Sequence, residues 1–296
     1  MEVKFYVGQA GLVPEARYRA FDAEPEFGRG PVGKRVTVEM AAISQQGIVS
    51  ERDQLRLRKA AQDVKEKILL DATRAAVYAV ADRVERQRGT VIATGKAVIN
   101  QDNYVDEADF GRDPSMSVTA TDLWSDPDAD RLDYLSTLKD LYSTTNGTDP
   151  GALLMGSRVA RALSNGNQFA TQLVGGGSRR GTRAEVNAIL ESEGLPLITV
   201  NDRRTSGGRV IPDDVIILLP SPVNPDGGES ELGATFWGQT LAASEPEWGI
   251  EEAEQPGIVS AAFTNPGIPP IRHTFVDSLS LPVLANANLS LVAKVM

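Results

Sequence analysis

Residues 104–114, YVDEADFGRDP, gather four carboxylates around one phenylalanine and one glycine. The stretch follows KAVINQ and the turn Asp102-Asn103, so residues 96–110 are predicted to form a β-hairpin. Neighbouring side chains on a strand point to opposite faces, and carboxylates on one strand therefore do not converge without unusual bending. We expect these four carboxylates to lie along a structural hairpin rather than to form a metal or acid–base site. They are Asp106, Glu107, Asp109 and Asp113.

A second acidic segment, DPDAD at residues 126–130, places Asp126, Asp128 and Asp130 at alternate positions. This spacing begins a calcium-loop pattern, but the sixth position is Arg131 rather than glycine and the twelfth is not glutamate. The favoured interpretation is an acidic helix start with Asp126 or Asp128 as the N-cap. A hydrolase that uses the three aspartates with Mg²⁺ or Ca²⁺ stays open as an alternative of another class.

Composition excludes several classes of site. The 296 residues are 41% hydrophobic and 24% charged, which is ordinary for a globular protein. There is no cysteine, so disulfides, thiolate nucleophiles and cysteine metal centres are excluded. The single histidine, His273, lies in the strand-like IRHTFVDS and is interpreted as a packed or surface residue. We expect no cofactor, no membrane span and no secretory signal.

The charge is unevenly distributed. The net charge is −10, so free nucleic acid is not expected to bind through the overall field. Residues 101–150 hold twelve acids against three bases, whereas residues 157–183 hold five arginines and no acid. GGGSRRG, within the second segment, lacks the ending of a phosphate-binding loop. The two segments are either solvated surface or faces that meet in neighbouring subunits.

The N-terminal third of the chain contains two predicted strands and a long helix. VPEARYRAFD and KRVTVEMAAI form a hairpin around a Gly- and Pro-rich loop, and a lone hairpin must lie on another domain or subunit. The helix begins with Ser50 as N-cap and Asp53 three residues later, and Gly89 is expected at its C′ position. A bend is expected near Gln62 or Leu70. The predicted buried stripe is Leu57, Ala61, Val64, Ile68, Ala72, Ala75 and Ala79.

The rest of the chain alternates between short helices and strands. One helix, DADRLDYLSTLKDLYSTTN, turns Leu132, Leu135, Leu138 and Leu141 inward and ends at Gly147. The strand GALLMG, the helices SRVARALSN and TRAEVNAILESEG, and the strands PLITVND and RVIPDDVIILLP predict a small α/β block. Residues 221–256 are loop-rich. Two apolar strands around Asn286-Ala-Asn288 close the chain.

The order of these motifs resembles the phage lambda type of major capsid protein, which has the HK97 fold. The likeness runs from about Lys34 to the C-terminus, and KRVTVEMAAISQQGIVSERDQL matches the step from hairpin strand to helix. A late strand, Ile198 to Asp202, and the closing SLSLPVLANANLSLVAKV also fit. The matching central positions are Val105, Asp109, Phe110, Gly111, Trp124, Asp126 and Pro127.

The resemblance implies an α+β, HK97-like capsid fold in four parts. Residues 1–45 would form a short N-terminal arm and the extended E-loop hairpin, and residues 46–121 the P-domain with its spine helix and β-hairpins. Residues 122–255 would form the α/β A-domain, and residues 256–296 would return to the P-domain as strands. Little precedes Phe5, so the arm usual in the family is expected to be short, missing or removed. The residues expected at contacts between subunits are Arg17, Arg19, Phe21, Phe27, Arg29, Lys34, Arg35, Arg158, Arg161, Arg179 and Arg180.

The implied function is structural rather than enzymatic. The chain would assemble with many copies of itself into pentamers and hexamers of an icosahedral phage head around double-stranded DNA, without sequence-specific binding. Portal and scaffold would be partners during assembly in the bacterial cytoplasm, and a decoration protein is left open. The virion is the implied location. An encapsulin-type compartment, which shares the fold and holds protein cargo, remains the main alternative.

Overall fold

The computed structural model describes residues 2–7, 34–57, 62–101, 104–172, 177–223, 230–245, 250–251, 256–265 and 271–296. The chain divides into two compact units. Unit 1 comprises residues 1–3, 37–88 and 235–282, and unit 2 comprises residues 4–36, 89–234 and 283–296. Each unit is built around its own sheet, and the two are described in turn.

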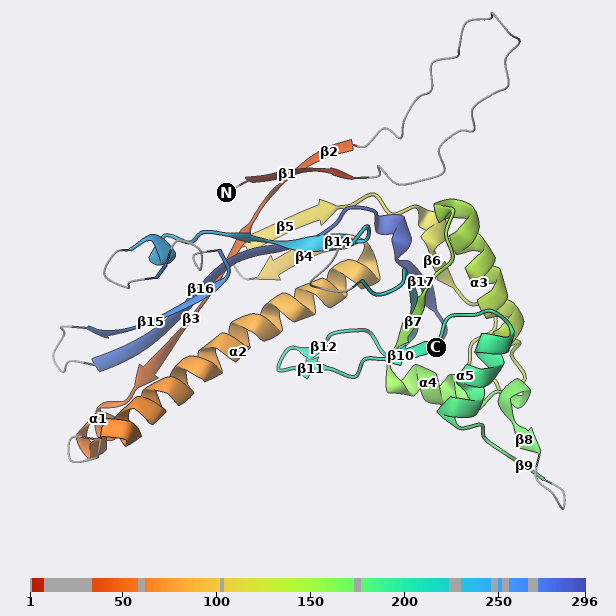
Figure 1. Ribbon diagram of the computed structural model, residues 1–296, viewed down its shortest axis with the longest axis horizontal. Helices are drawn as coiled ribbons and strands as arrows, with labels where there is room; N and C mark the ends of the chain where they lie inside the picture. Colours follow the sequence, from red (N-terminus) through yellow and green to blue (C-terminus); the bar gives the residue numbers. More distant parts are fainter. Residues whose placement is uncertain are drawn as a thin grey trace, which may run out of the picture. The chain divides into compact units, whose positions relative to one another are not determined.

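A four-stranded sheet organises unit 1, with β16 (Ile271–Leu284) at its centre (Figure 1). Its first ten residues pair antiparallel with β15 (Ile258–Asn265) on one edge and β3 (Ala41–Val49) on the other. Strand β14 (Gly233–Gly238) also pairs with β16. This last strand lies in the region that the sequence predicted to be loop-rich, so that prediction was incomplete.

The predicted N-terminal hairpin is only partly described. Its second strand divides into β2 (Lys34–Glu39) and β3, which are separated at Met40. Strand β2 pairs with β1 (Glu2–Val7), a strand that the sequence did not predict. The predicted first strand, VPEARYRAFD, lies outside the described residues.

Two helices, α1 (Glu51–Leu57) and α2 (Gln62–Thr94), occupy the predicted long helix. Ser50 caps α1 as predicted, because the Asp53 N–H donates to its Oγ at 3.2 Å. Gly89 does not end the helix, and that prediction was wrong. A Cβ at Gly89 would lie 2.1 Å from the backbone oxygen of Val210, so the glycine permits close packing inside α2. The helix ends instead at Gly95, whose φ is 73°.

The predicted buried stripe of α2 was also wrong. Val64, Ile68 and Ala75 are exposed, and Ala72 and Ala79 are only half-buried. The side chains of Leu57 and Ala61 lie outside the description. Instead, Val276 of β16 packs on Ala76 and Val80, one position along the helix from the predicted Ala75 and Ala79. Among the described side chains of α2, those that are buried belong to Ala76, Val80, Val84, Gln87 and Val91.

Unit 2 contains a five-stranded sheet in the order β10-β7-β13-β17-β6. Its strands are β6 (Ser117–Thr119), β7 (Ala152–Met155), β10 (Ile198–Val200), β13 (Val215–Leu219) and β17 (Leu291–Lys294). The β10–β7 and β17–β6 pairs are parallel, and β13 runs antiparallel to both neighbours. The two predicted closing strands are present as β16 and β17, but they belong to different sheets and do not pair as a hairpin. The 3₁₀ helix η6 (Ala287–Leu289), capped by the Asn286 side chain, separates them.

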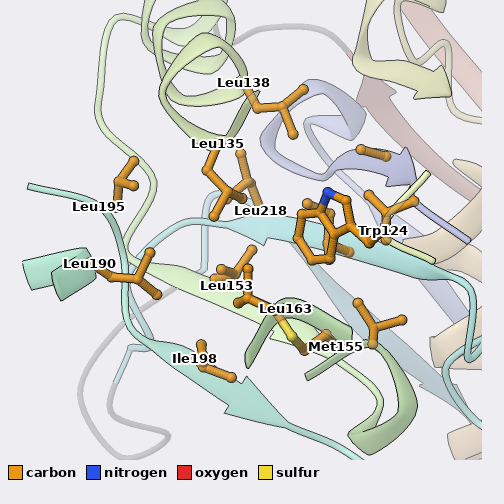
Figure 2. Close-up of a cluster of buried hydrophobic side chains, with 14 of the residues drawn as sticks. Trp124, Leu135, Leu138, Leu153, Met155, Leu163, Leu190, Leu195, Ile198 and Leu218 are labelled. Carbon is orange, nitrogen blue, oxygen red and sulfur yellow. The ribbon is translucent and has the colours of Figure 1, made fainter. Parts of the chain in front are cut away.

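Helices α3 (Arg131–Asn146), α4 (Ser157–Ser164) and α5 (Arg183–Ser192) pack on one face of this sheet (Figure 1). Leu135 and Leu138 of α3 are buried as predicted, whereas Leu132 and Leu141 are only partly buried. Figure 2 shows Trp124 and leucines of α3 pointing toward Leu153, Met155 and Leu218 on the strands. On the other face, the last turns of α2 contribute Ile92 and Ala93.

The ends of α3 follow from local chemistry. Its N-cap is Asp130, whose side chain accepts from the Asp133 N–H. The prediction of Asp126 or Asp128 as the N-cap was therefore wrong, because the helix begins later in the same acidic segment. Gly147 ends the helix with φ 75°, as predicted.

Three short hairpins complete unit 2. The first confirms the opening prediction and joins β4 (Lys96–Gln101) to β5 (Tyr104–Asp109), with the turn at residues 102–103 outside the description. The others join β8 (Thr171–Gln172) to β9 (Ser178–Arg179) and β11 (Arg204–Thr205) to β12 (Gly208–Arg209). Three short 3₁₀ helices follow other elements along the chain. They are η1 (Pro114–Met116) after β5, η2 (Asn167–Phe169) after α4 and η3 (Ala242–Ser244) after β14.

The close approach at Gly89 gives a test of the packing. In an open helix, Gly→Ala would stabilise the fold by about 1 kcal/mol. Here the added methyl meets the Val210 carbonyl, so we expect Gly89→Ala to lower the free energy of unfolding by about 1–3 kcal/mol. Urea unfolding measures this change, with Ala75→Gly at an exposed position of α2 as a reference for helix propensity alone. A stabilised Gly89→Ala variant would contradict the packing.

Candidate functional site

The carboxylates of residues 104–114 are engaged in local structure. Lys96 Nζ lies 2.8 Å from Glu107 Oε1 and 3.1 Å from Asp109 Oδ2 across the β4–β5 hairpin. These bonds to Glu107 and then Asp109 raise the pKa of Lys96. Asp113 caps η1 by accepting from the Ser115 N–H at 2.9 Å, which lowers the pKa of its carboxyl. Three of the four carboxylates therefore hold the hairpin and its exit.

The aspartates of residues 126–130 have equally local roles. Asp126 Oδ1 accepts from the Asp128 N–H at 3.0 Å, Asp128 accepts from the Asn167 side chain, and Asp130 caps α3. Asp130 also accepts from Gln168, and this bond lowers the pKa of its carboxyl. Among the described residues, no three His, Cys, Asp or Glu side chains form a group that could hold a metal ion.

The loop at residues 124–130 is bound by a buried arginine that sequence reasoning did not single out. Arg131 is fully buried, and its guanidinium donates to the backbone oxygens of Trp124 at 2.9 Å and Asp126 at 2.7 Å. It also donates to Pro127 at 3.0 Å, while burial lowers its pKa. A Cβ at Gly166 would lie 2.2 Å from its Nη1, so glycine is required there. Arg131 therefore fixes the acidic loop by its carbonyl oxygens rather than by its carboxylates.

A row of two exposed apolar side chains with a half-buried histidine between them, called the apolar row below, crosses the sheet of unit 1. Ile48, His273 and Phe263 are register partners on adjacent strands. They lie on the face opposite Val276, the residue that packs on α2. The rings of His273 and Phe263 stack with centroids 5.4 Å apart, in agreement with a packed or surface histidine. Ile48 is 64% exposed and Phe263 37% exposed, so this end of the sheet lacks a covering layer among the described residues.

An ion-pair network surrounds the start of α4. The N-cap, Gly156, has no side chain, and Asp202 Oδ1 accepts from the Ser157 N–H at 2.9 Å in its place. This bond, followed by one from Arg209 at 2.9 Å, lowers the pKa of Asp202. Arg158 Nη1 lies 3.8 Å from Asp213 Oδ1. A loop from a distant part of the sequence thus supplies the cap that α4 lacks.

The start of α5 carries a second engaged arginine. Arg179 binds Glu185 through two nitrogens, at 2.9 and 2.6 Å, and Thr182 completes a capping box with the same glutamate. The Arg179 bonds, and then those from Thr182, lower the pKa of Glu185 to about 2. The charge of Arg179 is therefore balanced within its own subunit.

Two further properties bear on function. An open groove runs between α2 and β15 and is lined by aliphatic atoms and by Lys67, Asp71 and Arg74, with Thr73 bonded to the Leu69 backbone oxygen. No helix among the described residues combines the length and hydropathy needed to cross a membrane. The residues that line the groove do not place a nucleophile beside a base.

Comparison with protein families settles the class of protein. The family model described as phage major capsid protein E matches residues 7–233, most of the chain. The chain belongs to the phage major capsid protein E family. Membership gives this capsid protein a structural role in a phage shell. A comparison with curated protein sequences found no match.

Solved structures establish the fold of the capsid protein. A protein assigned as a prophage capsid protein of E. coli CFT073 is 16% identical, with a TM-score of 0.62 over 98% of this chain and 85% of that one. A phage-related protein of Bordetella bronchiseptica RB50 is 14% identical, with a TM-score of 0.57 over 98% and 86%. The capsid of Myoviridae phage XM1 is 8% identical, with a TM-score of 0.51 over 100% and 86%. The fold is HK97-like, as predicted.

The structure places the predicted contact residues of the capsid protein in different situations. Arg17, Arg19, Phe21, Phe27 and Arg29 lie outside the described residues. Lys34 begins β2 and Arg35 is exposed on it. Arg158 and Arg179 are engaged within the subunit, as described above. Arg161 and Arg180 are exposed, and their side chains form no ion pair with the described part of the chain.

Sequence reasoning missed two features of the capsid protein. Arg112, within the quoted DFGRDP, was passed over although its side chain donates to two distant segments, at residues 92–93 and 287–290. The row of Ile48, His273 and Phe263 was missed because it depends on strand register. Alternation of exposed apolar residues on two strands was the available signal, but it does not show which strands become neighbours.

The Glu185 carboxyl gives a test by NMR titration. Its folded pKa of about 2 lies below the usual 4.5, so its stabilising effect is present above pH 4.5 and is lost as the pH falls toward 2. We expect a titration midpoint near 2 in the wild type. In Arg179→Gln the midpoint should rise but stay below 4.5, since Thr182 still donates. An unchanged midpoint in that variant would contradict the pairing.

Proposed function

We propose that the chain is the shell-forming subunit of a tailed-phage head, assembling into pentamers and hexamers that enclose double-stranded DNA. Assembly would take place in the cytoplasm of the bacterial host, with a portal and a scaffold as partners. The domains predicted from the resemblance would take their usual places: E-loop at residues 1–45, P-domain at 46–121, A-domain at 122–255 and returning strands at 256–296. A decoration protein stays open.

The observation that carries this proposal is the exposed row of Ile48, His273 and Phe263. Monomeric proteins rarely leave β-sheet faces with large apolar groups uncovered, and exposed apolar surface of this kind marks an interaction site. Strands β3 and β15 flank β16 on its two sides, and neither pairs with a further strand among the described residues, so their outer edges can pair with another chain. The row supports contact with an adjacent copy.

The segment proposed to cover this row is the N-terminal hairpin of a neighbouring subunit. Its residues Arg17, Arg19, Phe21, Phe27 and Arg29 offer two aromatic rings for the apolar row and three cations for the acidic surface of a chain with net charge −10. Many modest contacts of this kind, repeated around a closed shell, give stability that no single contact supplies.

Assembly tests the proposal. Co-expressed with its scaffold, the wild-type chain should form closed particles by negative-stain microscopy, with DNA that resists nuclease in particles from an infected or induced host. Particles that hold protein cargo and no DNA would instead identify a compartment shell. A monomer under every condition would overturn the proposal.

The apolar row gives the matched variants. Ile48→Asp places a charge at a 64% exposed position, so the subunit should fold with little change while particle yield falls about tenfold or more. Gln45→Asp is the control, since it is exposed on the same strand but on the opposite face. Thermal melting checks that both variants fold. Equal yields from the two variants would show that the row is not an assembly surface.

A further inference from the structure

We propose that an arginine face of unit 2 docks on an acidic face of α3 in an adjacent copy, so that unlike charges alternate around each ring. The arginine face is formed by Arg161, Arg180 and Arg183. The α3 acidic face is formed by Asp133 and Asp140. The inference rests on the proposed function and names the surfaces that join subunits within a ring.

The α3 acidic face carries charge that its own subunit does not balance. Asp133, Thr137 and Asp140 are exposed at helical spacing, opposite the buried Leu135 and Leu138. Their side chains form no ion pair with the described residues. The two bases of the helix are unavailable, because Arg131 is buried and Lys139 Nζ donates to the Gly194 backbone oxygen at 2.9 Å and pairs with Asp149 at 3.5 Å.

The arginine face consists of those arginines of residues 157–183 that form no ion pair within the described part of their own subunit. Arg158 and Arg179 are neutralised by Asp213 and Glu185. Arg161 on α4, and Arg180 and Arg183 at the start of α5, are exposed, and none forms an ion pair within the described part of the chain.

The three guanidinium groups come from neighbouring segments. A Cβ at Gly181 would lie 2.5 Å from the backbone oxygen of Phe169, which places Gly181 beside η2, the turn that follows α4. Helices α4 and α5 also share one hydrophobic core (Figure 1). Arg180 and Arg183 therefore lie on either side of a segment that contacts the turn following α4, the helix that carries Arg161.

A second copy fits this face better than DNA does. A duplex-binding surface typically makes 6–10 phosphate contacts, whereas three free cations on a chain of net charge −10 give a weak field for a polyanion. Each copy carries both the arginine face and the α3 acidic face, so one contact of unlike surfaces can repeat from copy to copy and close into a ring. Exposed ion pairs add little affinity individually, but they select the orientation in which subunits meet.

Charge reversal tests the pairing. The variant R161E/R180E/R183E presents two acidic faces, and D133K/D140K presents two basic faces. Each should lose capsomers and shells about tenfold or more, because like charges then meet at every contact. The chain with all five changes should recover assembly, since its faces are again complementary. If all five changes together assemble no better than the triple variant, the pairing is wrong.

Co-expression of the two variants gives a sharper result. Each repels its own kind but attracts the other, so the two must alternate around a ring. Alternation closes only in rings with an even number of subunits, so hexamers should form and pentamers should not. Class averages of isolated capsomers, with native mass spectrometry of their composition, measure this outcome. Hexamers of random composition, or normal pentamers, would overturn the proposal.

The controls separate this inference from others. R52E/R204E/R272E makes the same change in charge at exposed arginines on other elements and should assemble as the wild type does. If it fails equally, net charge is responsible and the pairing is rejected. If R161E/R180E/R183E assembles normally but packages less DNA, the arginine face contacts DNA and the inference falls. A wild-type chain that never assembles, or that forms particles with protein cargo and no DNA, would reject the proposed function itself.

Discussion

The guanidinium group of Arg112 joins three segments of unit 2 that are far apart in sequence. It donates to the backbone oxygens of Ile92 and Ala93 at the end of α2, the latter at 3.0 Å. It also reaches the backbone oxygen of Ala287 at 3.4 Å and the Ser290 hydroxyl at 2.7 Å. Burial lowers its pKa to about 10, so the guanidinium stays charged at neutral pH. This positive charge stabilises the C-terminus of α2, where the helix dipole is negative. The helix end, the exit of the β4–β5 hairpin and the turn before β17 are thereby held together.

The turn at residues 286–290, which Arg112 contacts, also binds two other elements of unit 2. Asn288 Oδ1 accepts from the Asp113 N–H at 2.8 Å, and the Asn288 backbone oxygen accepts from Asn146 of α3 at 3.1 Å. Gly95, with φ 73°, leaves room for Arg112, since a Cβ there would lie 3.0 Å from that side chain. The turn is thus a meeting point of α2, α3 and the hairpin exit, and it lies between strands β16 and β17 of the two sheets.

Features decided within a few residues could be predicted from the sequence, and features decided by packing could not. Ser50 and Gly147 act as caps because the cap is formed by neighbouring backbone groups. Gly89 carries the same local signal as Gly147, yet it lies inside a helix because the Val210 carbonyl is against it. The hydrogen-bond partners of Arg112 in DFGRDP all lie far away in the sequence, so periodicity and spacing give no sign of its role.

The same division applies to the charged surfaces. The sequence shows two opposed runs of charge, and each run taken whole overstates the surface that is free to meet a partner. Lys96 engages Glu107 and Asp109, and the aspartates of residues 126–130 are held by backbone and amide groups. Contacts inside the subunit thus engage most of the acidic run and two of the five arginines, because a charge with a partner in its own fold contributes little to a new contact. What the fold leaves unbalanced, rather than what the sequence accumulates, defines the surfaces by which copies can recognise one another.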